Sequence, residues 1–144
     1  MNEESSIRSY RDLRVWNEAM NLAEQCYIET RAFPRAEMFG MTSPIRRSAA
    51  SVPANIAEGY GRSNAGSYVQ FLRIAQGSLK ELETHVLLSQ RVGLLAAAAT
   101  EALLARAESV GKMLRALIRS IEQPKAEGTV RLPTAQARLP RRGP

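Results

Sequence analysis

Apolar residues recur every three or four positions along most of the chain, a spacing that is typical of amphipathic helices. It predicts four helices, over about residues 10–30, 43–58, 64–92 and 100–122. No stretch alternates apolar and polar residues for long, and no Asn-Gly or Asp-Gly turn occurs, so hairpins are not expected. Four amphipathic helices with short connections indicate an all-α protein, an antiparallel up-and-down four-helix bundle.

Individual residues mark where these helices begin, bend and end. Ser43 is expected to cap the second helix, with Pro44 in its first turn, where the missing N–H costs nothing. Pro53 lies inside the same helix and predicts a kink nearby, because proline cannot donate to the helical ladder. Gly59 and Gly61 are expected to end this helix with positive φ angles, and Asn64 is expected to cap the next one.

Composition changes this picture mainly at the C-terminus. The chain has 144 residues, 44% of them apolar, and a formal net charge of +6. Residues 124–144 contain four prolines, five basic residues and one acidic residue, a net charge of +4 that leaves +2 for residues 1–123. We therefore expect a flexible N-terminus over residues 1–9, the bundle over 10–123, and a basic, proline-containing disordered tail over 124–144.

The cysteine content and the absence of long apolar runs limit the class of protein. The single cysteine, Cys26, excludes an intrachain disulfide, and its place on the first apolar stripe indicates a small core residue. The first residues contain no apolar leader, and the longest nearly apolar run, residues 92–99, is too short to span a bilayer. These features predict a cytoplasmic protein.

Catalytic motifs are missing from the sequence. A di-iron bundle needs two Glu-x-x-His motifs, but His85 is the only histidine and Leu82 stands three residues before it. Nothing marks the nucleophile and carboxylate that a hydrolase would place around His85. We therefore expect no enzymatic activity, no catalytic residue, no metal and no cofactor, and we expect His85 at a surface or an interface.

Arginine supplies 17 of the 20 basic residues, and its planar guanidinium suits the oxygens of a phosphate. A GC-rich genome would produce the same bias. The candidate nucleic-acid-binding residues are Arg46, Arg47, Arg62, Arg73, Arg138, Arg141 and Arg142. The alternative for Arg46 and Arg47 is ordinary surface charge, with one of the two paired with Glu58 or another carboxylate.

Among the aromatic residues, Tyr60 is the best candidate for stacking on a base, because it lies at a turn beside Arg62.

A second group of residues is expected to hold helices or subunits together: Asn55, Glu58, Gly59, Ser78 and Glu81. Asn55 and Glu58 lie one turn apart and are interpreted as polar groups that fix the register of the second helix through hydrogen bonds. Ser78 and Glu81 have the same spacing on the third helix, and we expect them to form the complementary face.

Two segments are distinctive, RRSAASVPANIAEGYGR at residues 46–62 and YVQFLRIAQGSLKELET at residues 68–84. Together with residues 13–16 and 33–34, they resemble the bacterial four-helix-bundle family whose genes are found in intervening sequences of large-subunit ribosomal RNA genes. The accessory proteins of diversity-generating retroelements are more distantly similar. The resemblance covers residues 10–122, and it implies a bundle that assembles as a ring, typically a pentamer, with nucleic-acid binding as the suspected activity. Pro44 and the basic tail depart from the family pattern.

Two functions are therefore in competition. The first is a non-enzymatic homopentamer that binds RNA or DNA electrostatically, because a ring repeats each weak basic site. The alternative is a protein-interaction scaffold that partners a nucleic-acid enzyme without binding nucleic acid itself. The small net charge of residues 1–123 favours this alternative. A basic face would favour the first function, and an exposed apolar groove would favour the second.

Overall fold

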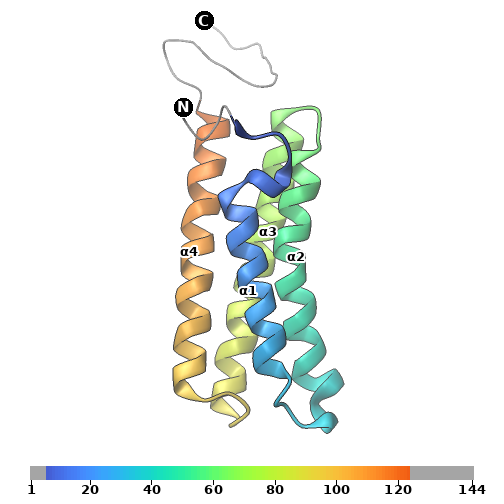
Figure 1. The fold of residues 1–144 in the computed structure, drawn as a ribbon, viewed down its shortest axis with the longest axis vertical. Coiled ribbons are helices and arrows are strands. Elements are labelled where there is room, and N and C mark those ends of the chain that lie inside the picture. The colour runs from blue at the N-terminus through green and yellow to red at the C-terminus, as the bar shows by residue number, and fades with distance from the viewer. Residues whose placement is uncertain (1–5, 124–144) are drawn as a thin grey trace, which may run out of the picture.

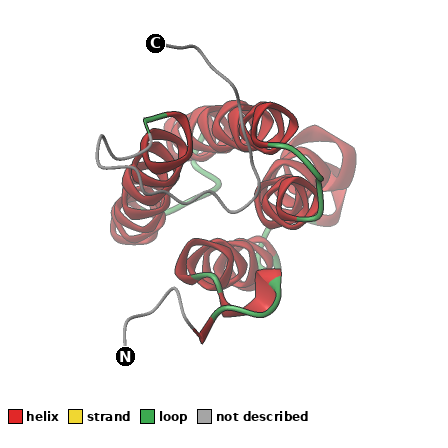
Figure 2. Ribbon diagram, turned by 90° about the horizontal axis from the view of Figure 1, so that it is seen from above, coloured by secondary structure: helices red, strands yellow, loops and turns green. Residues whose placement is uncertain are grey.

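The computed structural model describes residues 6–123, and four long helices contain most of them. These helices are α1 (Arg14–Thr30), α2 (Ser43–Tyr60), α3 (Ala65–Arg91) and α4 (Ala97–Glu122). They pack side by side as a helical bundle (Figure 1). Seen end-on, each helix lies beside its neighbour in the chain, and α4 lies beside α1 (Figure 2). No residue between 6 and 123 belongs to a strand, so the all-helical prediction is confirmed.

The apolar stripes of all four helices meet in a single core. Its largest fully buried aliphatic side chains are Leu22, Ile45, Ile56, Leu72, Leu79, Leu82 and Leu114. Cys26 is fully buried among them, as expected of a core residue. Burial, with a smaller contribution from the charge of Glu29, raises the pKa of the Cys26 thiol to about 12. The thiol is therefore neutral at ordinary pH, and a neutral thiol is a poor nucleophile.

The chain enters α1 through a short 3-10 helix, η2 (Tyr10–Asp12), so α1 begins four residues later than the pattern predicts. Leu13 interrupts the helix because its backbone is extended. The carboxylate of Asp12 accepts hydrogen bonds from the backbone N–H groups of Arg8 and Ser9, at 2.8 and 3.1 Å. These two bonds lower the pKa of Asp12 and tie residues 8 and 9 to the start of the bundle.

The connection from α1 to α2 is itself helical. It contains a 3-10 turn, η3 (Arg35–Glu37), and a π-helix, η4 (Met38–Thr42), which runs directly into α2. The predicted N-cap at Ser43 is therefore wrong, because Thr42 before it is already helical and no side chain caps α2. The π-helix supplies the turn that a cap would otherwise complete. Pro44 does lie in the first turn of α2, as predicted.

Gly59 serves close packing instead of a turn. The helix α2 continues through Gly59 to Tyr60, and among residues 6–123 only Gly93, after α3, is a glycine with positive φ, at 82°. The expectation of a positive φ at Gly59 and Gly61 is therefore wrong, although Gly61 does follow the last residue of α2. A Cβ atom at Gly59 would lie 2.9 Å from Cβ of Phe71 on α3. The absence of a side chain thus lets α2 approach α3 closely.

Contacts at two levels along α2 and α3 hold these two helices in a defined register. Ser51 of α2 lies opposite Ser78 of α3, with 2.7 Å between their hydroxyl oxygens, while Gly59 lies opposite Phe71. Pro53 is buried inside α2, which the structure assigns as one continuous helix, and the kink there stays a prediction. Asn64 caps α3 as predicted, with its side-chain oxygen accepting the N–H of Ser67 at 2.8 Å.

Some of the sequence predictions concern residues outside this structure. Residues 1–5 and the whole expected tail, 124–144, lie outside the described residues, and the tail includes Arg138, Arg141 and Arg142. From residue 6 to residue 123, no helix combines the length and the apolar character that crossing a membrane requires.

Gly59→Ala should lower the free energy of unfolding by about 1–3 kcal/mol, because the added methyl group overlaps Phe71 at the contact between α2 and α3. Urea denaturation followed by circular dichroism would measure the change.

Gly77→Ala is the matched control, since a Cβ at Gly77 on α3 meets nothing within 4 Å. This second change should raise the free energy of unfolding by about 0.5–1 kcal/mol, because alanine is the better helix former. Equal effects of the two substitutions would contradict the close contact at Gly59.

Candidate nucleic-acid interface

The four candidate arginines of the described chain do not form one stripe. Arg46 and Arg47 lie in the first turns of α2, Arg62 follows the end of that helix, and Arg73 lies on α3. At 1.5 Å per residue, Arg46 and Arg62 are about 24 Å apart along the axis of α2. The structure therefore separates these residues into two places at opposite ends of the bundle.

At one end, Arg62 and Arg73 already have carboxylate partners. Nη2 of Arg62 lies 2.7 Å from Oε2 of Glu58, and its guanidinium lies over the ring of Phe71, 4.6 Å from the ring centre. Nη2 of Arg73 lies 3.5 Å from Oε1 of Glu122. Both pairs are exposed, so they contribute little to stability. They nevertheless reduce the positive potential that these two arginines would offer to a phosphate.

At the other end, Arg46 and Arg47 bind hydroxyl groups instead of carboxylates. Nε of Arg46 donates to Oγ1 of Thr30 at 2.9 Å, and its guanidinium lies 4.6 Å from the centre of the Tyr27 ring. Nη1 of Arg47 donates to Oγ of Ser43 at 2.8 Å. Neither arginine is in an ion pair with any residue between 6 and 123.

Two further arginines, which the sequence interpretation missed, belong to the same end. Arg31 follows the last residue of α1 and Arg35 begins η3, and both are exposed. Neither is in an ion pair within the described residues. We call Arg31, Arg35, Arg46 and Arg47 the arginine end. The signal in the sequence was the charge count, since residues 31–47 contain four arginines and one acidic residue.

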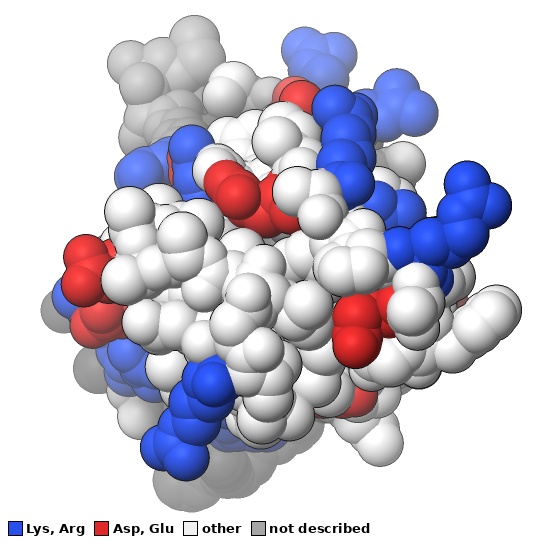
Figure 3. Space-filling model, turned by 90° about the horizontal axis from the view of Figure 1, so that it is seen from below, with Lys and Arg blue, Asp and Glu red and all other residues white. Residues whose placement is uncertain are grey.

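The single acidic residue of this segment, Glu37, is not in an ion pair with any of these four arginines. The side chain of Glu37 folds back over Gly40, where its Oε1 occupies the space that a Cβ would need. The view onto this end of the molecule shows Lys and Arg side chains projecting from the rim on several sides, with Asp and Glu side chains between them (Figure 3). Uncharged residues fill much of the centre. Positive charge without carboxylate partners is what a polyanion requires.

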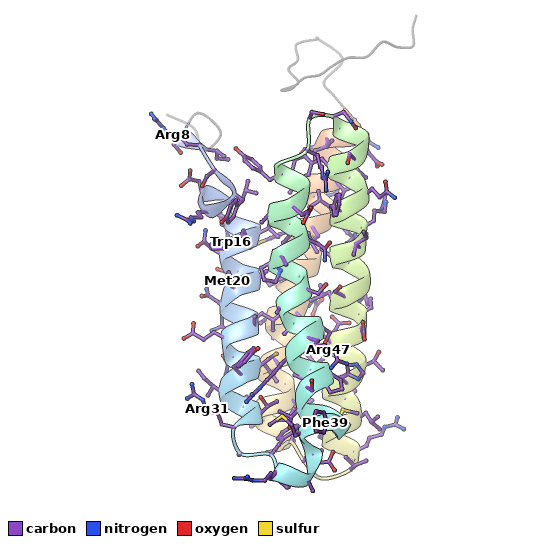
Figure 4. All side chains as sticks on the ribbon, turned by 90° about the vertical axis from the view of Figure 1, so that its right-hand side faces the viewer. Arg8, Trp16, Met20, Arg31, Phe39 and Arg47 are labelled. Carbon is purple, nitrogen blue, oxygen red and sulfur yellow. The ribbon has the colours of Figure 1, made fainter. Side chains whose placement is uncertain are left out.

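An exposed aromatic side chain lies within the arginine end. Phe39 of η4 is 89% exposed, more than any other large hydrophobic side chain in the described residues. Arg31, Phe39 and Arg47 all lie in the lower half of the molecule in Figure 4. Phe39 lies on η4, which precedes α2, and Arg47 lies on α2 itself. The predicted base-stacking residue, Tyr60, is half-buried, and its ring packs edge-on against that of Tyr68 at 6.2 Å.

The residues that were expected to join helices fall into two groups. Asn55 donates to the carbonyl oxygen of Ser51 at 2.8 Å and to its hydroxyl at 3.0 Å, and Ser51 in turn bonds Ser78 of α3. This chain of hydrogen bonds connects α2 with α3. Glu58 and Glu81 are exposed instead, Glu58 beside Arg62 and Glu81 with Oε2 3.5 Å from Nε2 of His85.

His85 lies one turn before a buried polar side chain of α3, that of Ser89. Its Nε2 and the hydroxyl of Ser89, one turn further along α3, are buried atoms without a hydrogen-bond partner among the described residues. Within residues 6–123, no group of three or more His, Cys, Asp or Glu side chains could hold a metal ion. Burial, with a smaller contribution from Tyr60, raises the pKa of Tyr68 to about 12, so its phenol stays neutral.

A groove lies between α3 and α4. Two adjoining hollows of about 400 Å³ each share Lys80, Gly111 and Arg115. Leu87 and Leu104 line one hollow, and Gly77 lines the other. The groove exists partly because the two glycines contribute no side chain to fill it. It combines apolar walls with charged residues of both signs, Lys80 and Arg115 together with Glu83 and Glu108.

These features define a helical-bundle protein with an unpaired basic end. Residues 11–116 match the family model of the 23S rRNA-intervening sequence protein, and the chain belongs to this family. A similar solved structure is a protein of unknown function from the S23 ribosomal protein family of Bacteroides thetaiotaomicron VPI-5482. It is 22% identical with a TM-score of 0.66, over 73% of this chain and 98% of that chain, and the likeness shows the fold. No curated protein matches the chain.

Arg46→Ala should lower the free energy of unfolding by about 1–2 kcal/mol, because it removes both the hydrogen bond to Thr30 and the contact with the Tyr27 ring. Arg47→Ala is the matched control, since Arg47 is exposed and bonds only Ser43; its effect should stay within about 0.5 kcal/mol. Urea denaturation of both variants measures the difference, and a larger loss for Arg47→Ala would refute this assignment.

Proposed function

We propose that this protein is a non-enzymatic homo-oligomer, a pentameric ring of antiparallel up-and-down bundles, that binds RNA or DNA electrostatically through its arginine end. The observation that carries the proposal is the group Arg31, Arg35, Arg46 and Arg47, none of which has a carboxylate partner within residues 6–123. Guanidiniums without such partners keep their full attraction for phosphate oxygens.

Assembly would amplify this weak attraction. A ring of five subunits would present twenty arginines of this kind, and each phosphate contact releases counterions from the nucleic acid. Linked sites of low affinity reach high avidity without any new contact. The cytoplasm, where RNA and DNA are available, is the location that this function requires.

Exposed apolar residues on α3 support the assembly. Ile74, Leu87, Leu88 and Val92 are each between 43% and 59% exposed in the single chain. Ile74 and Leu88 are separated by fourteen residues, close to four turns, so they lie on the same side of the helix. Large apolar side chains on one side of a helix favour contact with another surface.

The groove between α3 and α4 favours a second function, a protein-interaction scaffold that partners a nucleic-acid enzyme. Its two hollows are lined by Leu79, Leu87 and Leu104, with glycines where larger side chains would fill the space. A helix of another protein could lie in such a groove. In this alternative the protein would not bind nucleic acid itself.

Changing Arg31, Arg35 and Arg47 together to alanine in the full chain should weaken binding of structured RNA and duplex DNA at least tenfold at low salt. The slope of log affinity against log salt should also become shallower, because fewer counterions are released. Fluorescence anisotropy across a salt series measures both. Arg46 is left in place because it also bonds Thr30.

Two matched triple variants serve as controls. Arg106, Lys112 and Arg119 are exposed on α4, and changing them to alanine removes the same charge from another surface. Changing Arg138, Arg141 and Arg142 tests the candidates of the tail. Equal losses in all three variants would refute a specific role for the arginine end, and a wild-type protein that binds neither ligand at low salt would leave the scaffold as the better proposal.

Light scattering tests the assembly. The chain has a mass of 15.9 kDa, so a pentamer should weigh about 80 kDa. The double substitution Ile74→Glu and Leu88→Glu should lower the measured mass, because it places charges on the exposed apolar side of α3. Ser109→Glu with Ser120→Glu, at two exposed positions of α4, should leave the mass unchanged. A monomeric wild-type protein at high concentration would overturn the ring.

A further inference from the structure

We propose that Phe39 is a stacking platform for an unpaired nucleobase, so that the arginine end binds single-stranded RNA or DNA in preference to a duplex. The inference rests on the proposed nucleic-acid binding and goes beyond it, because electrostatic attraction alone does not distinguish a base face from a backbone. The ligand is defined by its chemistry, an exposed base joined to phosphates.

The exposure of Phe39 needs an explanation. Its side chain is 89% exposed, whereas the next most exposed large hydrophobic residue, Val92, is 59% exposed. Exposure of a phenyl ring to water is unfavourable, and the side chain of a phenylalanine is ordinarily buried in the core of the protein. A ring that remains outside is available to a ligand.

The ring is presented from a fixed backbone. Phe39 belongs to the π-helix η4, in which Thr42 is buried and Met41 packs against the core. The backbone N–H of Ser43 bonds the carbonyl oxygen of Met38, so η4 joins α2 without a break. Inward-facing residues thus anchor the turn while Phe39 projects outward, and a held aromatic ring loses little conformational entropy on stacking.

Guanidiniums flank this ring along the same run of helix. Arg35 opens η3 four residues before Phe39, and Arg47 lies in the first turns of α2, with which η4 is continuous. Arg47 and Phe39 are about 12 Å apart along the axis. A strand that stacks one base on Phe39 could therefore place neighbouring phosphates near Arg35 and Arg47.

The charges disfavour contact between the arginine ends of two copies of the chain. Contact between two arginine ends would bring eight guanidiniums together, and Glu37, the only acidic residue of segment 31–47, folds over Gly40. Like charges in an interface are repulsive. A polyanion that also exposes the flat faces of aromatic bases matches both the arginines and the phenyl ring of Phe39. Only unpaired bases expose these faces, because the bases of a duplex are already stacked on one another.

The test compares four ligands of equal length with the full-chain protein: a single-stranded RNA, a single-stranded DNA, an abasic DNA strand and a duplex DNA. The abasic strand keeps the phosphate charge and lacks the bases. We expect wild-type protein to bind both single strands at least about fivefold more tightly than the abasic strand and the duplex, by fluorescence anisotropy at one salt concentration. A difference between the RNA and DNA arms would show which of the two strands is preferred.

Phe39→Ala should remove this advantage. Base–aromatic stacking corresponds to an affinity ratio of about 5–150 for one base, so single-strand affinity should fall by a factor in that range. Affinity for the abasic strand and for the duplex should stay unchanged. Phe39→Trp should restore single-strand binding, and Met20→Ala, at an exposed apolar position of α1, should change none of the four affinities.

The outcomes separate this inference from the proposed function. Salt-dependent binding of all ligands with no effect of Phe39→Ala would overturn stacking and leave electrostatic binding intact. An equal loss for all four ligands would assign Phe39 a structural role. A lower mass of Phe39→Ala in light scattering would make the ring a subunit contact, and a wild-type protein that binds none of the ligands would overturn both proposals.

Discussion

The close contact between α2 and α3 is the constraint on which the rest of the structure depends. Gly59 lets the backbone of α2 approach Phe71, and the hydroxyls of Ser51 and Ser78 bond one another further along the same two helices. Together these contacts fix both the distance and the register of α2. Because the π-helix η4 is continuous with α2, the same contacts determine where Phe39 and Arg47 lie. The packing of α2 against α3 near Gly59 thus determines the surface that carries Phe39 and Arg47 at the opposite end of the bundle.

The sequence predicts the helices well because burial repeats locally. The positions of the four helices, the cap at Asn64 and the burial of Cys26 all follow from the spacing of apolar residues or from a single local hydrogen bond. The start of α2 was predicted wrongly. Ser43 has the side chain of a capping residue, but the residue before it, Thr42, is already helical. Gly59 was misread for a related reason: its role depends on a residue of another helix.

The candidate interface was harder to predict because charge depends on three-dimensional partners. Arg73 is neutralised by Glu122, which is forty-nine residues away in the sequence and adjacent in space. Arg31 and Arg35 were overlooked because they stand in a connection, where the apolar pattern carries no signal. The exposure of Phe39 depends on which side of η4 faces the core, and a π-helix changes the number of residues per turn, so the usual spacing rule does not place it.

The helical character of the connection between α1 and α2 has a consequence for evolution. Surface loops ordinarily tolerate insertions and deletions, because their ends can stay in place while the loop changes length. Here residues 38–42 form a helix that is continuous with α2. One inserted residue would rotate everything before it by about 100° around the helix axis. This short segment should therefore vary in composition but keep its length among relatives that share the same surface.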